Sequence, residues 1–303
     1  MKHLPISAIV VVVVVAGIIA HPSTRAPGAL SEAEGQAPAP AGIPERTRDN
    51  DGQSRVEQVN VGGTPRISAA DAAKPVPRLP DGRVDLTGPW VGGGSNADIE
   101  RDGGLKPGEL PLLPWAQKLR DSRKAENEPY TACLPMSVPR VNPYPWKFAM
   151  TYTSRGLTHI YVLHETGDAG AHRVIYMDGR QHPPDALPTW WGHSIGSWDG
   201  DTLVVDTVGY NDKFWFDARG TPHTEQLHTV ERWTRVNFGT MINDFLLDDP
   251  GAFSRPVRLR FTAMHVRPDL DLMEFICLED NQYGAAGGFT PAQPDREPVA
   301  AGR

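Results

Sequence analysis

The sequence predicts a mainly β fold: an antiparallel β-barrel or sandwich, lipocalin-like in one version, with one or two short surface helices. From residue 146 onward, short runs of alternating apolar and polar residues follow one another. Gly, Pro and Asp residues separate these runs at the spacing of turns, which is typical of antiparallel barrels and sandwiches. The sequence contains no βαβ alternation and no GxGxxG after a strand, which disfavours a nucleotide-binding α/β fold.

The alternating runs define the expected strands. Residues 157–166 and 172–180 should form an antiparallel pair, and 188–207 a hairpin. Residues 224–235 alternate over a longer stretch and should form one long strand. A third hairpin is expected in 256–280, turning at "RPDLD".

One surface helix of about three turns is expected between residues 105 and 130. Pro114 suits a first helical turn, and Trp115 with Leu119 four residues later forms one apolar stripe.

The N-terminus has the layout of a secretory signal. Lys2 precedes an apolar stretch from Ile6 to Ala20, which is too short for a comfortable membrane span. We therefore expect residues 1–20 to be a signal peptide, or an N-terminal anchor if uncleaved, and the protein to be secreted or periplasmic. Contact with a membrane is expected only through this segment.

Composition divides the rest of the chain. Residues 21–77 are rich in Ala, Pro, Gly, Ser and charge and lack large aromatics, so we expect a disordered linker. The β domain should span residues 78–284, and 285–303 should be a flexible tail.

Charge and cysteine content exclude some classes. The 303-residue chain has a formal net charge of −7 and no dense Lys/Arg block, so nucleic acid is not an expected partner. The only cysteines, Cys133 and Cys277, either pair in an oxidising compartment or remain buried thiols. Two cysteines without a CxxC do not support a cysteine zinc site.

Several strings resemble a numerous group of exported bacterial proteins with no activity to carry over. They are "RLPDGRVDLTGPW", "HRVIYMDGRQHP", "WWGHSIGSWDGDTLVVDTVGYND", "PHTEQLHTVERWTR" and "LDDPGAFSRP", within residues 78–283. The resemblance implies a bacterial, secreted, mostly β protein. "GPW" at residues 88–90 is also similar to the Gly-x-Trp of lipocalins.

The stretch "PTWWGHSIGSWDGDTLVVDT" holds the main candidate site. Asp199-Gly200 between alternating runs predicts a two-residue hairpin turn of type I′. That turn places His193 directly opposite Asp206, on one face of the ribbon. A three-residue loop would instead put Thr207 opposite His193.

A partly buried His193–Asp206 pair has a chemical use. The carboxylate fixes the tautomer of the imidazole and stabilises its protonated form, so the free nitrogen becomes a better base. Trp190 and Trp191 lie beside the pair and would provide an aromatic wall. The alternative is that the imidazole only satisfies its hydrogen bond with the nearest carboxylate.

A second constellation lies in "PHTEQLHTVER". On a regular strand His223 and Glu225 share one face, while His228 lies on the other. His223 or Glu225 could complement His193 as the acid. Alternatively, His193, His223 and Glu225 could bind a metal, since nitrogen and carboxylate ligands suit zinc or iron.

The candidate substrate-binding residues are Trp190, Trp191, Tyr176, Trp215 and Arg140.

Three functions remain open. The first is an exported acid–base enzyme (a lyase, hydratase, isomerase or cyclase) that needs no cofactor and acts on a small, partly apolar or aromatic molecule in a Trp-lined cavity. The second is a lipocalin-like small-molecule binding protein. The third is a metal-dependent hydrolase or oxygenase using His193, His223 and Glu225, for which a divalent metal would be the cofactor.

Overall fold

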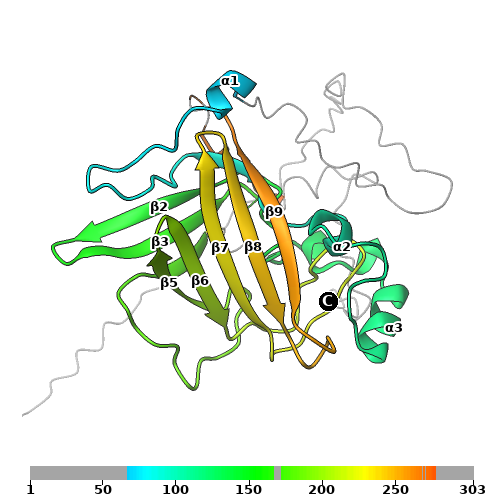
Figure 1. Cartoon of the computed structure of the whole chain (residues 1–303). Coiled ribbons are helices and arrows are strands. Elements are labelled where there is room, and N and C mark those ends of the chain that lie inside the picture. The colour runs from blue at the N-terminus through cyan, green and yellow to red at the C-terminus, as the bar shows by residue number, and fades with distance from the viewer. Residues whose placement is uncertain (1–66, 167–171, 268, 270, 278–303) are drawn as a thin grey trace, which may run out of the picture. The chain divides into compact units, whose positions relative to one another are not determined.

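The computed structural model describes residues 67–166, 172–267, 269 and 271–277, all within one compact unit. The predicted signal or anchor (1–20), the linker up to residue 66 and the predicted tail (285–303) lie outside these residues. The described part is mainly β, 37% strand and 12% helix. The predicted fold class is confirmed, and the architecture is a closed barrel (Figure 1).

Nine strands close the barrel in sequence order. They are β1 (Pro89–Gly92), β2 (Trp146–Thr153), β3 (Gly156–His164), β4 (His172–Tyr176), β5 (His193–Asp199), β6 (Thr202–Val208), β7 (His228–Asn237), β8 (Thr240–Asp248) and β9 (Val257–His265).

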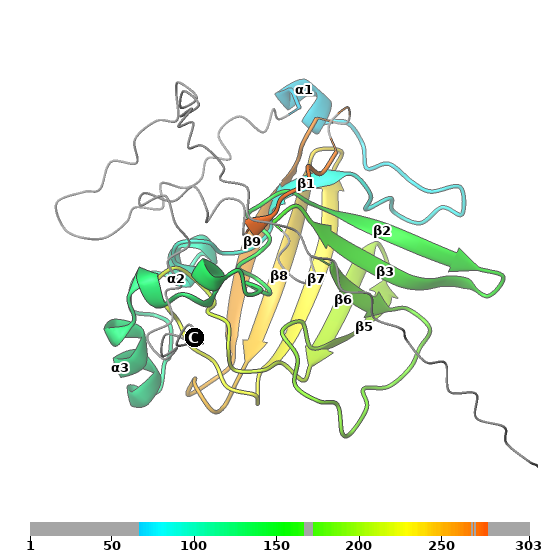
Figure 2. The same ribbon diagram turned by 180° about the vertical axis from the view of Figure 1, so that it is seen from behind.

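The odd number of strands explains the one parallel contact in the barrel. Strand directions cannot alternate all the way round a closed ring of nine, so one neighbouring pair must run the same way. That pair is β4–β5, whereas the other eight contacts are antiparallel. Parallel neighbours need a long crossover connection, and residues 177–192 supply it (Figure 2).

The first half of the barrel follows the predicted pattern. β3 and β4 pair antiparallel, as expected for 157–166 and 172–180. β2 is an addition to the prediction and forms a hairpin with β3. Along β3, Ile160 and Val162 are buried while the residues between them are only half-buried, so the strand has one interior and one outer face.

The second half departs from the prediction at three points. β7 begins at His228 instead of residue 224, because residues 224–227 form a turn before it. β8, which was not expected, forms a hairpin with β7. Residues 256–280 do not form a hairpin among their described residues: β9 lies between β8 and β1 and closes the barrel.

In the part of the chain that the structure describes, three short α-helices and two 3₁₀ helices lie outside the barrel wall. They are α1 (Ala69–Ala72), α2 (Ile99–Asp102), α3 (Pro114–Ser122), η1 (Ala125–Asn127) and η2 (Pro129–Ala132). α3 begins at Pro114 as predicted. The apolar stripe predicted from Trp115 and Leu119 is not the buried face of α3. Trp115 is 44% exposed, whereas Ala116 and Arg120 are buried. Every described helix is too short or too polar to cross a membrane.

The linker prediction is also wrong for its last residues. Residues 69–72 form α1, capped by the Ser68 hydroxyl. The chain then docks on the β7–β8 turn, where Phe238 N donates to Lys74 O at 2.8 Å and Gly239 N to Ala72 O at 3.0 Å. Ordered structure therefore begins before residue 78.

Side chains fill the barrel. One apolar cluster includes Trp146 and Trp233, whose ring centroids are 5.0 Å apart, with Phe148 against both. A second apolar cluster joins one end of the barrel to the α2–α3 region, and includes Phe245 and Phe253. Each fully buried side chain of this size stabilises the fold by about 1.5–3 kcal/mol.

Cys133 and Cys277 form a disulfide across a sequence separation of 144 residues. Of the two outcomes that the sequence left open, the paired one is present.

Candidate functional site

The hairpin at the candidate site is present, but its turn lies one residue later than predicted. Gly200 and Asp201 form the turn, and Asp199 pairs with Thr202. Gly200 has φ of 58°, which fits a type II′ turn with glycine at its first central position. The pairing therefore shifts by two residues relative to the prediction.

This shift corrects the predicted pairing of His193. His193 lies opposite Val208, and Asp206 lies opposite Ile195. The face is unchanged, because side chains alternate with a period of two. That face is the outside of the barrel: the neighbouring residues Ser194 and Val205 are buried, whereas His193 and Asp206 are partly exposed. The predicted Trp-lined interior setting is therefore wrong.

His182, which we did not predict, connects His193 to Asp206. His182 Nδ1 is 2.8 Å from His193 Nδ1, and His182 Nε2 is 3.0 Å from Asp206 Oδ1. His228 Nε2 is also 3.0 Å from Asp206 Oδ1. We call these four residues the histidine cluster.

Each member of the histidine cluster comes from a different element. His193 begins β5, Asp206 lies in β6 and His228 begins β7. His182 comes from the crossover 177–192 and contacts His193 and Asp206 on the outer face of these strands. A parallel bridge between Thr189 and Tyr210 anchors the far end of this crossover.

The hydrogen bonds determine which nitrogens carry protons. An ionised carboxylate only accepts, so His182 and His228 donate through Nε2 to Asp206. The Nδ1 of a neutral His182 then accepts from His193 Nδ1, which leaves His193 Nε2 with a free lone pair. Burial lowers the pKa of His193, and the nearby His182 and Arg180 lower it further. His193 is therefore neutral at neutral pH, and its Nε2 lone pair is available to accept a proton.

Aromatic rings extend the site along the outer wall. The Tyr176 ring stacks on His193 with centroids 5.0 Å apart and an interplanar angle of 22°. The Arg180 guanidinium lies 3.8 Å from the centroid of Tyr176, and His159 contacts the edge of the same ring at 5.5 Å. Tyr176, Arg180 and His159 therefore pack in series beside His193.

The second predicted constellation does not join this site. His223 is 3% exposed, and its Nε2 is 3.0 Å from Phe214 O. Its ring contacts Phe214 and Phe216, and burial lowers its pKa to about 4. Glu225 is exposed on the turn before β7. The prediction assumed one continuous strand through residues 224–235. The turn at 224–227 interrupts it, so His223 and Glu225 do not share a strand face.

Of the five predicted substrate-binding residues, only Tyr176 contacts the histidine cluster. Trp191 stacks on the buried His164 at 5.4 Å, and Trp190 packs against the second apolar cluster. Trp215 is buried under the Arg123 guanidinium, and Arg140 is buried in an ion pair with Glu128. Arg140 is therefore not free to meet an anionic substrate.

Sequence reasoning missed His182 because it lies in a Pro-rich connection without periodicity. The prediction set His228 on the face away from Glu225 of a regular strand, but Glu225 lies on the turn before β7, and nothing in the sequence linked His228 to Asp206. The signal for His228 was its position on the strand next to β6, on the outer face.

The predicted metal ligands His193, His223 and Glu225 do not form a metal site. Within residues 67–277, apart from the undescribed gaps, no group of three or more His, Cys, Asp or Glu side chains is arranged to hold a metal ion.

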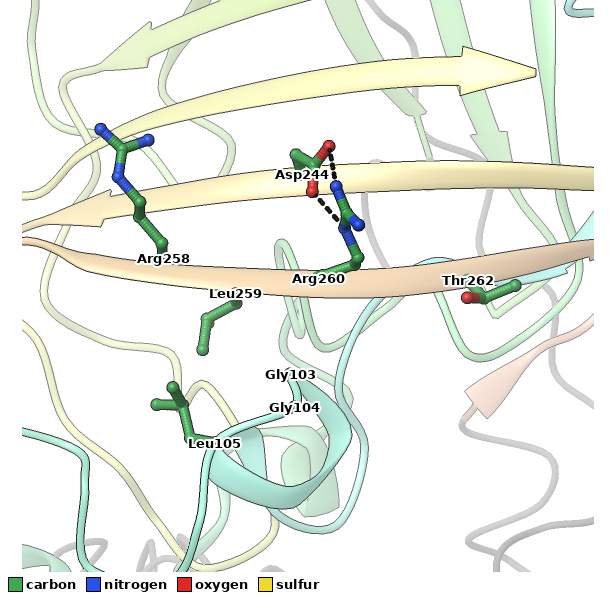
Figure 3. Close-up of a pocket in the computed structure, with 8 residues that line it drawn as sticks. All are labelled: Gly103, Gly104, Leu105, Asp244, Arg258, Leu259, Arg260 and Thr262. Atoms are coloured by element: carbon green, nitrogen blue, oxygen red, sulfur yellow. Dashed lines mark hydrogen bonds and ion pairs between the residues drawn. The ribbon is translucent and has the colours of Figure 1, made fainter. Parts of the chain in front are cut away.

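Two hollows of the structure do not include the histidine cluster. The larger, of about 590 Å³, lies between the α2 end and β8–β9 (Figure 3). Its Arg260 is neutralised by two hydrogen bonds to Asp244 at 2.6 and 3.0 Å. The smaller, of about 200 Å³, contains Arg235 and His265.

No protein-family model, curated protein or solved structure matches the chain. The resemblance to exported bacterial proteins therefore stays a prediction, and any function has to be argued from the geometry.

Proposed function

We propose that the protein is an exported enzyme that carries out general acid–base chemistry, of the lyase or isomerase type, on a small, partly aromatic molecule. His193 would be the base. The observation that carries the proposal is the continuous hydrogen-bonded chain from His193 through His182 to Asp206.

This chain allows a proton to be taken up without moving heavy atoms. When His193 Nε2 accepts a proton from the substrate, His193 Nδ1 passes its own proton to His182 Nδ1. The resulting His182 imidazolium is stabilised by Asp206, as the carboxylate of a catalytic triad stabilises its histidine. Reversal of the same steps returns the proton, so one group serves as base and then as acid.

The surroundings of His193 suit a planar substrate. The Tyr176 ring stacks on His193, and His159 packs in turn against Tyr176, so His193 lies at the end of a row of aromatic rings. Aromatic pairs of this kind contribute about 0.5–1.5 kcal/mol beyond the area they bury.

The disulfide supports export. Disulfides persist in oxidising compartments and are rare in reducing ones, so the Cys133–Cys277 bond agrees with the predicted signal segment and a secreted or periplasmic location.

A lipocalin-like carrier is compatible with a closed barrel, but such a carrier needs space among the interior side chains. The Trp146, Phe148 and Trp233 rings pack there at centroid distances of 5.0–5.9 Å. The outer-wall cluster therefore supports the enzyme better than the carrier.

A generic proton-abstraction probe tests the proposal without knowledge of the substrate. 5-Nitrobenzisoxazole is planar, and its ring opens when a base removes one C–H proton. We expect the protein to accelerate this opening, with a rate that rises with pH around a midpoint below 6.5, because the pKa of His193 is lowered.

His193→Ala should reduce this rate by about 10²-fold or more, the usual contribution of a positioned base. Asp206→Asn should also reduce it, because the amide lacks the negative charge that stabilises the His182 imidazolium. His172→Ala, on the same outer wall but outside the histidine cluster, is the control. Equal rates for His193→Ala and His172→Ala would refute the proposed role of His193.

A further inference from the structure

A single arginine inside the barrel contacts three strands at once. Arg173 of β4 is 2% exposed. Its Nε donates to Ser194 Oγ at 2.9 Å, and one terminal nitrogen donates to Thr207 Oγ1 at 2.6 Å. The other terminal nitrogen forms an ion pair with the fully buried Glu231. These partners belong to β5, β6 and β7 in turn.

The same three strands carry the histidine cluster on their outer side. Ser194 directly follows His193, and Thr207 directly follows Asp206. Adjacent residues of a strand point to opposite faces. The interior contacts of Arg173 therefore fix the backbone immediately behind His193 and Asp206. Ser194 and Thr207 are also cross-strand partners, and Thr207 Oγ1 donates to Ser194 Oγ at 3.0 Å.

β4, the strand that carries Arg173, is joined to β5 by only a short ladder of backbone pairs. β4 and β5 share only two residue pairs, Ile175 with Ser194 and Tyr176 with Ile195. The crossover 177–192 begins where β4 ends and finishes where β5 begins. The position of His182 on the outer wall therefore depends on how β4 is held against β5.

We propose that Arg173 is a positioning residue: by holding β4 against β5, β6 and β7 from inside the barrel, it places His182 between His193 and Asp206. This inference rests on the proposed function for its biological meaning. Its physical content is the geometry of the hydrogen-bonded chain, which is measurable by itself.

The test removes the links and keeps the arginine. Replacing Arg173 would leave Glu231 buried without its partner, and such a variant is at risk of not folding. Ser194→Ala and Thr207→Val each remove one hydroxyl and leave the Arg173–Glu231 ion pair in place.

The readout is the tautomer of His193, from ring ¹⁵N chemical shifts at pH 8. In the unmodified protein we expect the Nδ1–H form, because His193 Nδ1 donates to His182. In Ser194→Ala and Thr207→Val we expect the Nδ1–H population to fall at least twofold, toward the Nε2–H form that a solvated imidazole favours. Thr207→Ser, which keeps the hydroxyl, should restore the original tautomer.

Thr221→Val is the matched control, because it removes a buried hydroxyl that donates to the buried Asp217 elsewhere in the fold. It should lower the melting temperature and leave the His193 tautomer unchanged. If Ser194→Ala and Thr207→Val behave like this control, Arg173 is only structural and the inference is overturned.

The proposed function fails separately. If His193→Ala keeps the probe reaction while the tautomer still responds to Ser194→Ala and Thr207→Val, Arg173 positions the chain of imidazoles but the chain is not the catalyst.

Discussion

His164 illustrates how strongly burial acts on one imidazole. It is 5% exposed, and neither ring nitrogen has a hydrogen-bond partner among the described residues. Its ring lies flat against Trp191, with an interplanar angle of 10°. Burial, with a further contribution from the charge of Arg173, lowers its pKa to about 3. His164 is therefore neutral in the folded protein at neutral pH.

The lowered pKa makes His164 a source of acid sensitivity. Between pH 6.5 and about 3 the unfolded chain binds the proton and the folded protein does not, so the free energy of unfolding falls as the pH falls. We expect this residue alone to remove about 3 kcal/mol between pH 7 and pH 4. Urea unfolding measures the free energy of unfolding at both pH values. The loss of this free energy between pH 7 and pH 4 should be smaller in His164→Leu than in the unmodified protein, by about 3 kcal/mol.

A variant destabilised without loss of a titratable group, Val162→Ala on the same strand, should keep the original pH dependence. An unchanged pH dependence in His164→Leu would show that His164 is not the neutral buried group described here.

At the scale of elements, two connections determine the candidate site. The β5–β6 turn sets which outer residues are neighbours, and the crossover 177–192 adds His182 to them. The turn was predictable from a local Asp-Gly signal, although its exact centre was not. The crossover follows from the parallel β4–β5 contact, which only the closure of nine strands requires.

The turn itself gives a prediction at this scale. Gly200 has φ of 58°, and an added Cβ would meet nothing within 4 Å. The cost of a side chain is therefore purely conformational, and Gly200→Ala should destabilise the protein by about 1–2 kcal/mol. Gly200→Asn should cost less, because asparagine tolerates positive φ. Urea unfolding measures both, and equal stability of Gly200→Ala and the unmodified protein would argue against this turn.

At the scale of the whole molecule, the disulfide joins the η2 region to the chain after β9. Cys133 and Cys277 close a loop spanning 144 residues. In the chain-entropy model, a cross-link over a loop of this length stabilises the fold by about 4–5 kcal/mol. Other contacts of the segment after β9 include the bond from Val266 N to Pro89 O, the ion pair of Lys147 with Asp271 and the bond from Met273 N to Glu165.

Reduction should therefore lower the free energy of unfolding by about 4–5 kcal/mol. Urea unfolding with and without dithiothreitol measures this difference. The double variant Cys133→Ser, Cys277→Ser should have the same free energy of unfolding as the reduced protein, and dithiothreitol should not change it. Coincident unfolding curves for the oxidised and reduced protein would contradict the stabilising role.

The sequence by itself determined the β class, the strand–turn–strand unit at 193–208 and the shared face of His193 and Asp206. These follow from local alternation, and a shift of two residues in pairing leaves the face unchanged because the period is two.

Only the tertiary structure decided that this face is the outer wall, that His182 joins the pair, and that Arg140 forms a buried ion pair with Glu128. Such contacts link residues on separate elements. Their distances are set by barrel closure and side-chain packing. The local periodicity of the sequence carries no information about either.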